Sequence, residues 1–284
     1  MKNKKVLVIL GGNSGERNVS IQSGRACIKA LKKMGYKVST FDPKRKPLNV
    51  IDRSKVDIIF NALHGKEGED GVAQSYFEYL RIPYTHSGII SSYNAMNKVI
   101  SKEIFKKNKI RSPKYFVLKK ENYKKNKLFF LIKKTGIKFP IVVKPINEGS
   151  SLGVNICQNI NSLKKKVKLL FKKYSDLIFE PFIGGQEIQV AVINNSPLGV
   201  IELKPKRKFY DYKAKYSKSA KTKHIMPANL KKNKYKEALQ IALKAHNALG
   251  CKGITRSDFK FFKNKFYLLE INTQPGMTSL SLVP

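Results

Sequence analysis

Acidic residues are scarce in this chain of 284 residues, which has 19 aspartates and glutamates against 57 lysines and arginines. A place where several carboxylates gather is therefore conspicuous. Arginine is also scarce, so most of the formal net charge of +38 comes from lysine. Arginine is the side chain that makes bidentate contacts to bases and phosphates, and the lysines are spread along the chain. We therefore attribute the charge to a lysine-rich composition and expect no specific nucleic-acid partner.

Cysteine and long hydrophobic runs are also lacking. Cys27, Cys157 and Cys251 are too few and too scattered for a disulfide framework or a zinc site. This pattern is typical of the reducing cytoplasm, where we expect the protein to act. The apolar run Val6–Leu10 is too short for the core of a signal peptide or for a membrane span, so it predicts a buried first strand and no membrane association.

The residues that are present favour a globular protein of two or three lobes, since 42% are hydrophobic and 16 are phenylalanine. The first part of the chain alternates predicted strands with predicted helices at Val19–Met34 and from Asp70, a possible N-cap, to Leu80. This order is typical of a parallel sheet with helices on both faces. Its strands are predicted at Val6–Leu10, Lys37–Phe41, Val56–Ala62 and Ile82–Tyr84.

Ligands bind at the carboxyl ends of the strands in such sheets, where Asn13–Glu16 and His64–Gly71 lie. The glycines after the first strand do not form a dinucleotide fingerprint. Glu16 is the only acid in its loop, so it either holds an ammonium group or favours the start of the following helix. His64 could titrate or form hydrogen bonds, whereas we interpret the other histidines as structural or solvated: His86, His224 and His246.

A second lobe is predicted after a helical segment over Ser87–Asn108, with a boundary near residues 96–112. Its loop Gly149–Gly153 is dense in glycine and serine, so it suits either close approach to phosphate or a simple hairpin. Lys144 ends the preceding strand, within reach of such a phosphate. Six strands are expected to form one antiparallel-looking sheet: Lys114–Leu118, Pro140–Lys144, Val154–Cys157, Leu177–Glu180, Glu187–Ile193 and Leu198–Leu203.

Carboxylates gather in the last part of the chain. Strands are predicted at Gly253–Phe262 and Phe266–Ile271, with Lys263–Asn264 as a tight turn between them. Pairing of these strands would bring Asp258, Glu270 and Asn272 together beside Arg256. Such hard oxygen ligands suit Mg²⁺ with nucleotide phosphates better than Zn²⁺, although ordinary polar residues of a surface hairpin would give the same pattern. Before this hairpin lie Lys204–Pro227, a possible functional loop, and a predicted helix, Asn229–Leu249.

Seven segments, taken in order, closely resemble those of the D-alanine–D-alanine ligases, a family of the ATP-grasp superfamily. They are GGNSGERNVS, NALHGKEGEDG, VVKPINEGSSLGV, EIQVAV, FYDYKAKY, RSDF and LLEINTQPGMTSLSLVP. The resemblance implies a mixed α/β protein of ATP-grasp architecture, whose central and C-terminal lobes grip ATP. The implied parts are a substrate domain with a doubly wound parallel sheet (1–96), a central lobe with the glycine-rich loop (97–184) and a C-terminal lobe with the metal site and a lid (185–284).

The resemblance also implies roles for residues that would bind ATP and metal. Lys98 and Lys144 match the lysines on the phosphates, and Gly149 and Ser151 belong to the loop over them. Glu180 matches the acid beside adenine, and Glu187 the acid on the ribose. Two Mg²⁺ or Mn²⁺ ions would be held by Asp258, Glu270 and Asn272.

The substrate residues follow from the same resemblance. Glu16 matches the group that holds the ammonium of the first D-alanine, in a hydrogen-bonded set with Ser150 and Tyr216, and His64 lies nearby. Lys215 would offset charge on the transferred phosphoryl group, inside a lid formed by Lys204–Pro227. The residues implied for the second half of the reaction are Arg256 and the Gly276 N–H, as oxyanion donors, and Ser281 and Leu282, as the pocket for the second carboxylate.

The implied activity is ATP-dependent synthesis of D-alanyl-D-alanine through an acylphosphate, for peptidoglycan precursors. The same resemblance predicts that the protein is a homodimer. The alternatives are a D-alanine–D-lactate or D-alanine–D-serine ligase and a decayed, non-catalytic ATP-binding remnant. Family members continue with a further helix after the SLVP segment, whereas this sequence stops at Pro284. We therefore expect exposed apolar surface in the C-terminal lobe and a looser pocket at Ser281. Asn18, where an acid is common, affects no residue with an implied role.

Overall fold

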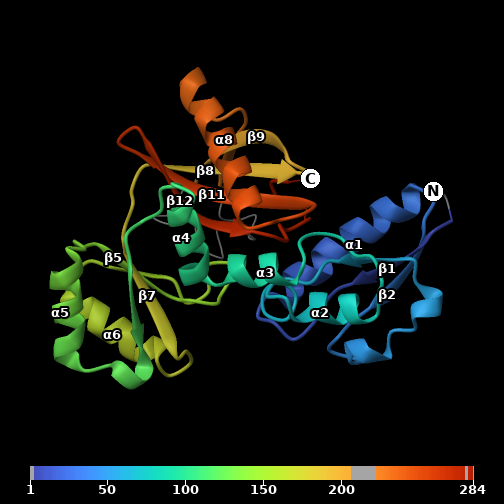
Figure 1. Ribbon diagram of the computed structural model, residues 1–284, viewed down its shortest axis with the longest axis horizontal. Coiled ribbons are helices and arrows are strands. Elements are labelled where there is room, and N and C mark those ends of the chain that lie inside the picture. Colours follow the sequence, from blue (N-terminus) through green and yellow to red (C-terminus); the bar gives the residue numbers. More distant parts are fainter. Residues whose placement is uncertain (1–2, 206–221, 279–280, 284) are drawn as a thin grey trace.

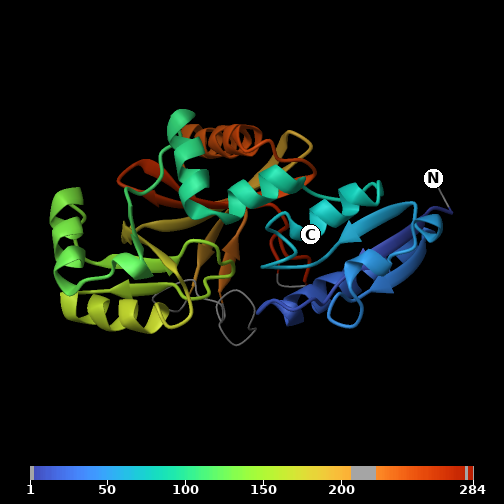
Figure 2. The same ribbon diagram turned by 60° about the horizontal axis from the view of Figure 1, so that its bottom comes forward.

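The computed structural model describes residues 3–205, 222–278 and 281–283, and this part of the chain contains three β-sheets. Figures 1 and 2 show the N-terminal sheet at one end of the molecule and the second sheet at the other end. The third sheet lies between them, so the loops of all three lobes approach one another near the middle of the molecule.

The N-terminal sheet is parallel, as predicted, with the strand order β2-β1-β3. The central strand is buried over residues 6–9, as its apolar sequence requires. The predicted strand at Ile82–Tyr84 is reduced to a single bridge between Ile59 and Tyr84. The elements are β1 (Lys5–Ile9), α1 (Arg17–Lys33), β2 (Lys37–Phe41), the 3-10 helices η1 (Leu48–Val50) and η2 (Arg53–Lys55), β3 (Ile58–Asn61) and α2 (Val72–Tyr79).

The expected N-cap of α2 is displaced by one residue. Gly71 occupies that position with a φ of 96°, a left-handed conformation that glycine adopts readily. The Asp70 carboxylate instead accepts hydrogen bonds from the backbone N–H groups of Glu67 (2.9 Å) and Val72 (3.2 Å). Asp70 therefore stabilises the turn that leads into the helix without being its cap.

The helical segment after the N-terminal sheet is divided into α3 (Ile89–Met96) and α4 (Lys98–Lys107). Asn97 has extended backbone angles, and its side-chain oxygen accepts hydrogen bonds from the N–H groups of Val99 and Ile100, both at 3.1 Å. An asparagine that caps a helix in this way starts a new one. The break places Lys98 in the first turn of α4.

The second sheet is antiparallel and has the order β4-β7-β5-β6. Its two helices pack on it through buried aliphatic side chains such as Leu128, Leu163 and Val167. The loop Gly149–Gly153 joins β5 to β6, as predicted. The elements are β4 (Phe116–Lys119), η3 (Lys120–Asn122), α5 (Lys125–Thr135), β5 (Ile141–Pro145), β6 (Asn155–Cys157), α6 (Ile160–Leu170) and β7 (Asp176–Pro181).

The third sheet has the order β10-β9-β8-β11-β12 and is covered by α8 (Lys232–Ala248). The expectation that β8 (Gln186–Ile193) and β9 (Ser196–Lys204) would extend the second sheet is wrong. The chain turns away after β7 at Gly185, which has a φ of 83° and where a Cβ would lie 2.2 Å from the carbonyl oxygen of Phe261. β8 therefore pairs with β11 (Ile254–Phe262). The remaining strands are β10 (Lys223–Ile225) and β12 (Lys265–Asn272).

The hairpin of β11 and β12 forms as the alternation predicts. Lys263 and Asn264 have φ values of 48° and 62°, as a two-residue hairpin turn requires. Asp258 lies opposite Glu270, and Arg256 lies opposite Asn272. The sequence pattern therefore fixed which side chains meet across this pair of strands. No helix in the described ranges is long and apolar enough to cross a membrane.

Candidate active site

Two neighbouring cavities lie where the three lobes meet. The first is lined by residues from all three: Glu16, His64, Glu69, Lys98, Glu148, Gly149, Ser150, Arg256, Glu270 and Asn272 among them. The second lies between the second and third sheets and includes Lys98, Lys144, Ser151, Glu180, Glu187, Asp258 and Glu270. Lys98, Glu148 and Glu270 border both cavities, so a ligand that fills both could place its parts side by side.

The second cavity has apolar walls and charged ends, a combination that suits a planar base with attached phosphates. Val142, Val154 and Phe182 contribute to the apolar walls. Lys98 stands at the border with the first cavity, and its ammonium group donates to the backbone oxygen of Glu148. Burial lowers the pKa of Lys98, against the opposing charge of Glu270.

Glu180 is buried between two lysines. Its carboxylate oxygens lie 2.9 Å from the ammonium groups of Lys102 and Lys144. Burial alone would raise the pKa of Glu180, but the charges of the two lysines outweigh it and lower this pKa from 4.5 to about 2. The carboxylate is therefore ionised at neutral pH. Lys102, which is only 1% exposed, is not among the residues predicted from the sequence. Its spacing of one helical turn from Lys98 was the available signal.

Glu187 also has a basic neighbour that the sequence pattern did not single out. Its carboxylate lies 2.7 Å from the ammonium group of Lys260. The two residues are directly opposite each other in the β8–β11 ladder. Lys260 could have been found only once the pairing of β8 with β11 was known, because the two residues are far apart in the chain.

The structure brings the predicted metal ligands together, but with one of them engaged by arginine. Arg256 makes a bidentate ion pair with Asp258, through Nε–Oδ1 at 2.7 Å and Nη2–Oδ2 at 3.0 Å. The Asn272 side-chain oxygen accepts from the backbone N–H of Gln274 at 2.8 Å. No group of three His, Cys, Asp or Glu side chains in the described part of the chain could hold a metal. The predicted set of two carboxylates and one amide fits Mg²⁺ by its donor chemistry.

Glu16 faces the first cavity, where it is 3% exposed. It stands at the N-cap position of α1 but makes no capping hydrogen bond with its side chain. Two glycines make room for it, since a Cβ at Gly65 would lie 2.6 Å from Oε2 and one at Gly149 would lie 3.2 Å from it. The side chain therefore does not cap the helix by a hydrogen bond, while its place at the N-terminus of α1 still fits an acid that favours the start of the helix.

The glycine-rich loop makes a tight turn over the junction of the cavities. Leu152 donates a backbone hydrogen bond to Gly149 at 2.9 Å, across Ser150 and Ser151. Both serines have positive φ values, 47° and 61°, and each such conformation costs roughly 1–2 kcal/mol for a residue other than glycine. The loop is thus a turn between two antiparallel strands, with Ser150 at one cavity and Ser151 at the other, and its close approach to a phosphate stays a prediction.

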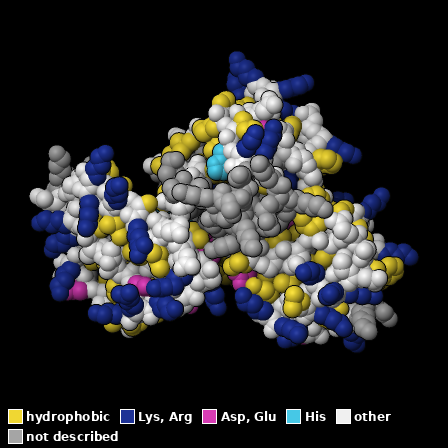
Figure 3. Space-filling view, turned by 180° about the vertical axis from the view of Figure 1, so that it is seen from behind, with side chains coloured by type: hydrophobic (Ala, Val, Ile, Leu, Met, Phe, Trp, Pro, Cys, Tyr) yellow, Lys and Arg dark blue, Asp and Glu magenta, His cyan; other side chains and the backbone are white. Residues whose placement is uncertain are grey.

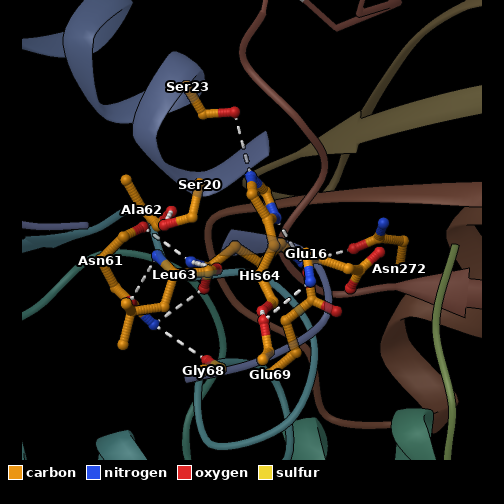
Figure 4. Close-up of polar contacts among 12 residues, drawn as sticks. Glu16, Ser20, Ser23, Asn61, Ala62, Leu63, His64, Gly68, Glu69 and Asn272 are labelled. Carbon is orange, nitrogen blue, oxygen red and sulfur yellow. Dashed lines mark hydrogen bonds and ion pairs between the residues drawn. The ribbon is translucent and has the colours of Figure 1, made fainter. Parts of the chain in front are cut away.

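His64 uses both ring nitrogens. Nδ1 lies 3.0 Å from the Glu69 carboxylate, and Nε2 lies 3.0 Å from the Ser23 hydroxyl (Figure 4). Neither partner was predicted, although Glu69 belongs to the segment that follows β3. As for the other histidines, His246 is buried, His86 is partly buried and His224 is exposed. Burial lowers the pKa of His86 to about 4, as expected of a structural histidine.

The segment after β12 is fastened to the N-terminal sheet by Gln274. Its amide nitrogen donates to the carbonyl oxygens of Asn61 (2.9 Å) and Leu63, and its amide oxygen accepts from Asn61 Nδ2 at 2.9 Å. Gln274 is 2% exposed and was not predicted. These hydrogen bonds hold the segment against the N-terminal sheet, directly after Thr273, which lines the first cavity.

The predicted residues of the C-terminal segment lie close together. A Cβ at Gly276 would lie 2.8 Å from the Ser281 hydroxyl, so a larger residue would not fit. Ser281 accepts from the backbone N–H of Thr278 at 3.0 Å. Leu282 and Arg256 border a further small cavity beside β8 and β9. Lys215 and Tyr216 lie outside the described residues, as does most of the predicted lid.

Solved structures with this fold define the class of protein. A D-alanine–D-alanine ligase from Bacillus anthracis superposes with a TM-score of 0.85 at 34% identity, over 99% of this chain and 90% of that one. A D-alanine–D-alanine ligase from Bacillus anthracis in complex with ATP gives a TM-score of 0.82 at 29% identity, over 99% of this chain and 90% of that one. The VanG D-Ala:D-Ser ligase from Enterococcus faecalis gives 0.84 at 29%, over 99% of this chain and 93% of the other. The fold is that of the ATP-grasp ligases.

Sequence comparison narrows the class to a family. Family models described as the N-terminus and the C-terminus of D-ala D-ala ligase match residues 42–87 and 104–284. The D-alanine–D-alanine ligase of Pelagibacter ubique is 57% identical over 283 residues, which are 99% of this chain and 91% of that protein. The ligase of Trichlorobacter lovleyi is 41% identical, with 100% and 89% covered. The chain belongs to the D-alanine–D-alanine ligase family.

Proposed function

We propose that the protein joins two D-alanine molecules to D-alanyl-D-alanine, consumes ATP through an acylphosphate and serves peptidoglycan precursor synthesis. One observation carries this proposal: the two cavities share Lys98 and Glu270 at their border. A carboxylate in the first cavity and the γ-phosphate of a nucleotide in the second would meet there. Direct transfer of a phosphoryl group requires this proximity.

The nucleotide would lie in the second cavity. Glu180, kept ionised by its two lysines, can accept a hydrogen bond from the amino group of adenine, and Glu187 can accept from a ribose hydroxyl. Lys144 would leave Glu180 and join Lys98 at the phosphates, while Lys102 would continue to balance the charge of Glu180. Backbone N–H groups of the turn that holds Gly149 and Ser151 can approach the phosphates.

Two Mg²⁺ or Mn²⁺ ions would be held by Asp258, Glu270 and Asn272. When bound, they would neutralise charge on the phosphate oxygens. Because both oxygens of Asp258 are engaged by Arg256, binding of metal would release the arginine side chain. Arg256 could then turn towards a substrate oxygen.

The first D-alanine would bind with its ammonium group on Glu16, in a set with Ser150 and Tyr216, and with His64 beside it. One of its carboxylate oxygens attacks the γ-phosphorus, the bond to the β-phosphate oxygen breaks, and ADP leaves. Lys215 would offset charge on the group in transit. The acylphosphate is sensitive to water, so the site needs a lid, which residues 204–227 would form.

The second D-alanine would bind with its carboxylate at Ser281 and the Leu282 N–H. Its free amine attacks the activated carbonyl carbon, and Arg256 and the Gly276 N–H stabilise the tetrahedral oxyanion. The C–O bond to phosphate then breaks, phosphate leaves and the nitrogen loses a proton. The product is the dipeptide.

The division of the chain into residues 1–96, 97–184 and 185–284, the cytoplasmic location and the homodimer are parts of the same proposal. Exposed apolar side chains on α2 and α3 support the dimer. Tyr79 is 83% exposed and Ile90 69% exposed, and Tyr76 and Tyr93 lie about one helical turn from them on the same helices. Lysine and arginine side chains lie at the top, on the left and on the right of the face in Figure 3, as a lysine-rich composition would give. A Tyr79→Glu variant should shift the protein to a monomer in light scattering.

Product analysis tests the proposal. The purified chain is incubated with ATP, Mg²⁺ and D-alanine, alone or with D-serine or D-lactate, and the products are separated by mass spectrometry. D-alanyl-D-alanine as the main product is expected. A D-seryl product would favour the second candidate, which the similarity to a D-Ala:D-Ser ligase supports. Binding of ATP without any product would favour a remnant that has lost catalysis.

A further inference from the structure

One hydroxyl group connects three parts of the chain behind the first cavity. Ser23, on α1, lies with its Oγ 3.0 Å from Nε2 of His64 and 3.1 Å from the backbone nitrogen of Met277. His64 belongs to the loop after β3, and Met277 to the segment after β12, 254 positions from Ser23. Figure 4 shows Ser23 and Glu69 on opposite sides of the His64 ring.

The chemistry of the groups fixes the direction of these hydrogen bonds. The Met277 N–H can only donate, so Ser23 Oγ accepts from it. The Glu69 carboxylate can only accept, so Nδ1 of His64 carries the ring proton, and in the neutral ring Nε2 then accepts the hydroxyl proton of Ser23. Nδ1–H donates to the Glu69 carboxylate at 3.0 Å. The neutral ring with its proton on Nδ1 is the form in which all four groups are paired.

The order of serine, histidine and glutamate resembles the triad of a hydrolase, but Ser23 is not placed to react. It is 1% exposed, and the first cavity is lined by His64 and Glu69 and not by Ser23. A substrate carbonyl could not reach its hydroxyl group. The arrangement therefore holds other groups in place.

The group held most directly is the segment that contains Gly276. Gln274 fastens its beginning to Asn61 and Leu63, and Ser23 fastens Met277 just after it. Between the two anchors lie Pro275, with a fixed φ, and Gly276, whose backbone is the least restricted of any residue. Without the second anchor, the orientation of the Gly276 peptide would depend on a glycine alone.

We propose that Ser23 is a positioning residue, which sets the direction of the Gly276 N–H and holds Nε2 of His64 at the same time. The proposal rests on the proposed function, in which the Gly276 N–H stabilises the oxyanion and His64 lies beside the first D-alanine. One side chain then couples the site of the first substrate to the site of the second half-reaction. A misplacement of the order of 1 Å at such a donor lowers a rate by about a hundredfold.

The test compares Ser23→Cys with Ser20→Ala. Cysteine has nearly the shape of serine but is a weak hydrogen-bond acceptor, so the variant should fold. Ser20 lies one turn earlier on the same helix and is also buried, and its hydroxyl joins Gly11 N (2.7 Å) to Ala62 O (2.8 Å). It thus controls for the loss of two buried hydrogen bonds. Ser23→Thr, which keeps the hydroxyl group, should restore function.

We expect Ser23→Cys to lower kcat for dipeptide formation by about tenfold to a hundredfold, with the KM for ATP unchanged. Acylphosphate formation, followed by positional isotope exchange in ATP labelled with ¹⁸O, should slow much less. Ser20→Ala should change neither kcat for dipeptide formation nor the rate of acylphosphate formation. A Ser23→Cys enzyme with the same kcat as Ser20→Ala would overturn the proposal.

Two measurements that need no catalysis test this proposal independently of the proposed function. Hydrogen exchange of the Met277 amide should become faster in Ser23→Cys and not in Ser20→Ala. The ¹⁵N resonance of Nε2 in the His64 ring should shift in Ser23→Cys, where its hydrogen bond to the hydroxyl group is lost, and not in Ser20→Ala. If the unaltered chain makes no dipeptide but these signals change as expected, the proposed function fails and the anchor stands. Unchanged exchange of the Met277 amide and an unchanged Nε2 resonance would refute the anchor itself.

Discussion

Replacement of Lys102 by methionine is the prediction that follows most directly from the geometry. The change keeps the length of the side chain but removes one of the two cations that flank the buried Glu180 carboxylate. Lys144 would become the sole counter-ion of Glu180. We expect the variant to be less stable and to bind ATP more weakly, because Lys144 would be held more firmly away from the phosphates.

The size of the effect on stability can be worked out in two ways. The pKa of Glu180 falls from 4.5 to about 2 in the folded protein, so its ionised form is stabilised by about 3 kcal/mol net at roughly 1.4 kcal/mol per pH unit, with both lysines acting against the cost of burial. Removal of one partner from a buried ion pair typically costs about 3–5 kcal/mol. We therefore expect Lys102→Met to lose about 3 kcal/mol of unfolding free energy, and its KM for ATP to rise about tenfold.

The pH dependence has a definite sign. Because the folded pKa of Glu180 lies below 4.5, its contribution to stability is complete above that pH and is lost as the pH falls towards about 2. In Lys102→Met, burial still raises the pKa of the carboxyl while only one lysine opposes it. The loss of stability on acidification should therefore begin at a higher pH than in the unaltered protein.

Urea denaturation of the two single variants and the double variant provides the assay. Lys102→Met, Glu180→Gln and their combination form a double-mutant cycle, in which the double variant should lose at least 1 kcal/mol less than the sum of the single ones. The control is Lys119→Met, since Lys119 pairs with Glu121 at 3.9 Å with both side chains more than half exposed; it should lose less than about 1 kcal/mol. Additive losses, or a Lys102→Met variant as stable as the control, would refute the reasoning.

Three further predictions concern the two cavities. Gly65→Ala should raise the KM for the first D-alanine at least tenfold, because its Cβ would lie 2.6 Å from Glu16 Oε2. The control is Gly136→Ala, since Gly136 has a similar φ and a Cβ there would have no atom within 4 Å. Equal kinetics of the two variants would count against the role of Glu16. Arg256→Ala should lose about 10²–10³ in kcat and still fold by circular dichroism, so near-normal turnover would exclude Arg256 as an oxyanion donor. Removal of divalent cations with EDTA should abolish phosphate release while the chain stays folded, and Mn²⁺ should restore activity; activity without any divalent cation would contradict the metal site.

Local patterns were sufficient for the parts of the site that lie on one hairpin or in one loop. The alternation in β11 and β12, with a turn of two residues between them, determines that Asp258 faces Glu270. The break at Asn97 could also have been predicted, because an asparagine before a helical segment is a strong N-cap. The assignment of β8 to the wrong sheet has a physical reason: alternation predicts a strand but not its partner.

Contacts between segments that are far apart in the chain could not be predicted from the sequence. Lys102 and Glu180 become neighbours only when α4 packs beside the second sheet, and Ser23 meets Met277 only when the third lobe docks on α1. No local composition distinguishes Ser23 from Ser20 on the same helix. The carboxylates could be picked out because they are scarce, whereas one lysine or serine among many carries no such signal.

The origin of the oxygen in the released phosphate tests the central claim most directly. D-Alanine labelled with ¹⁸O in both carboxylate oxygens is converted with unlabelled ATP, and phosphate and dipeptide are analysed by mass spectrometry. If a carboxylate oxygen attacks the γ-phosphorus, that oxygen leaves with the phosphate, so each phosphate should carry a single ¹⁸O atom. Phosphate without ¹⁸O, formed together with the dipeptide, would contradict the acylphosphate and with it the proposed use of the two cavities.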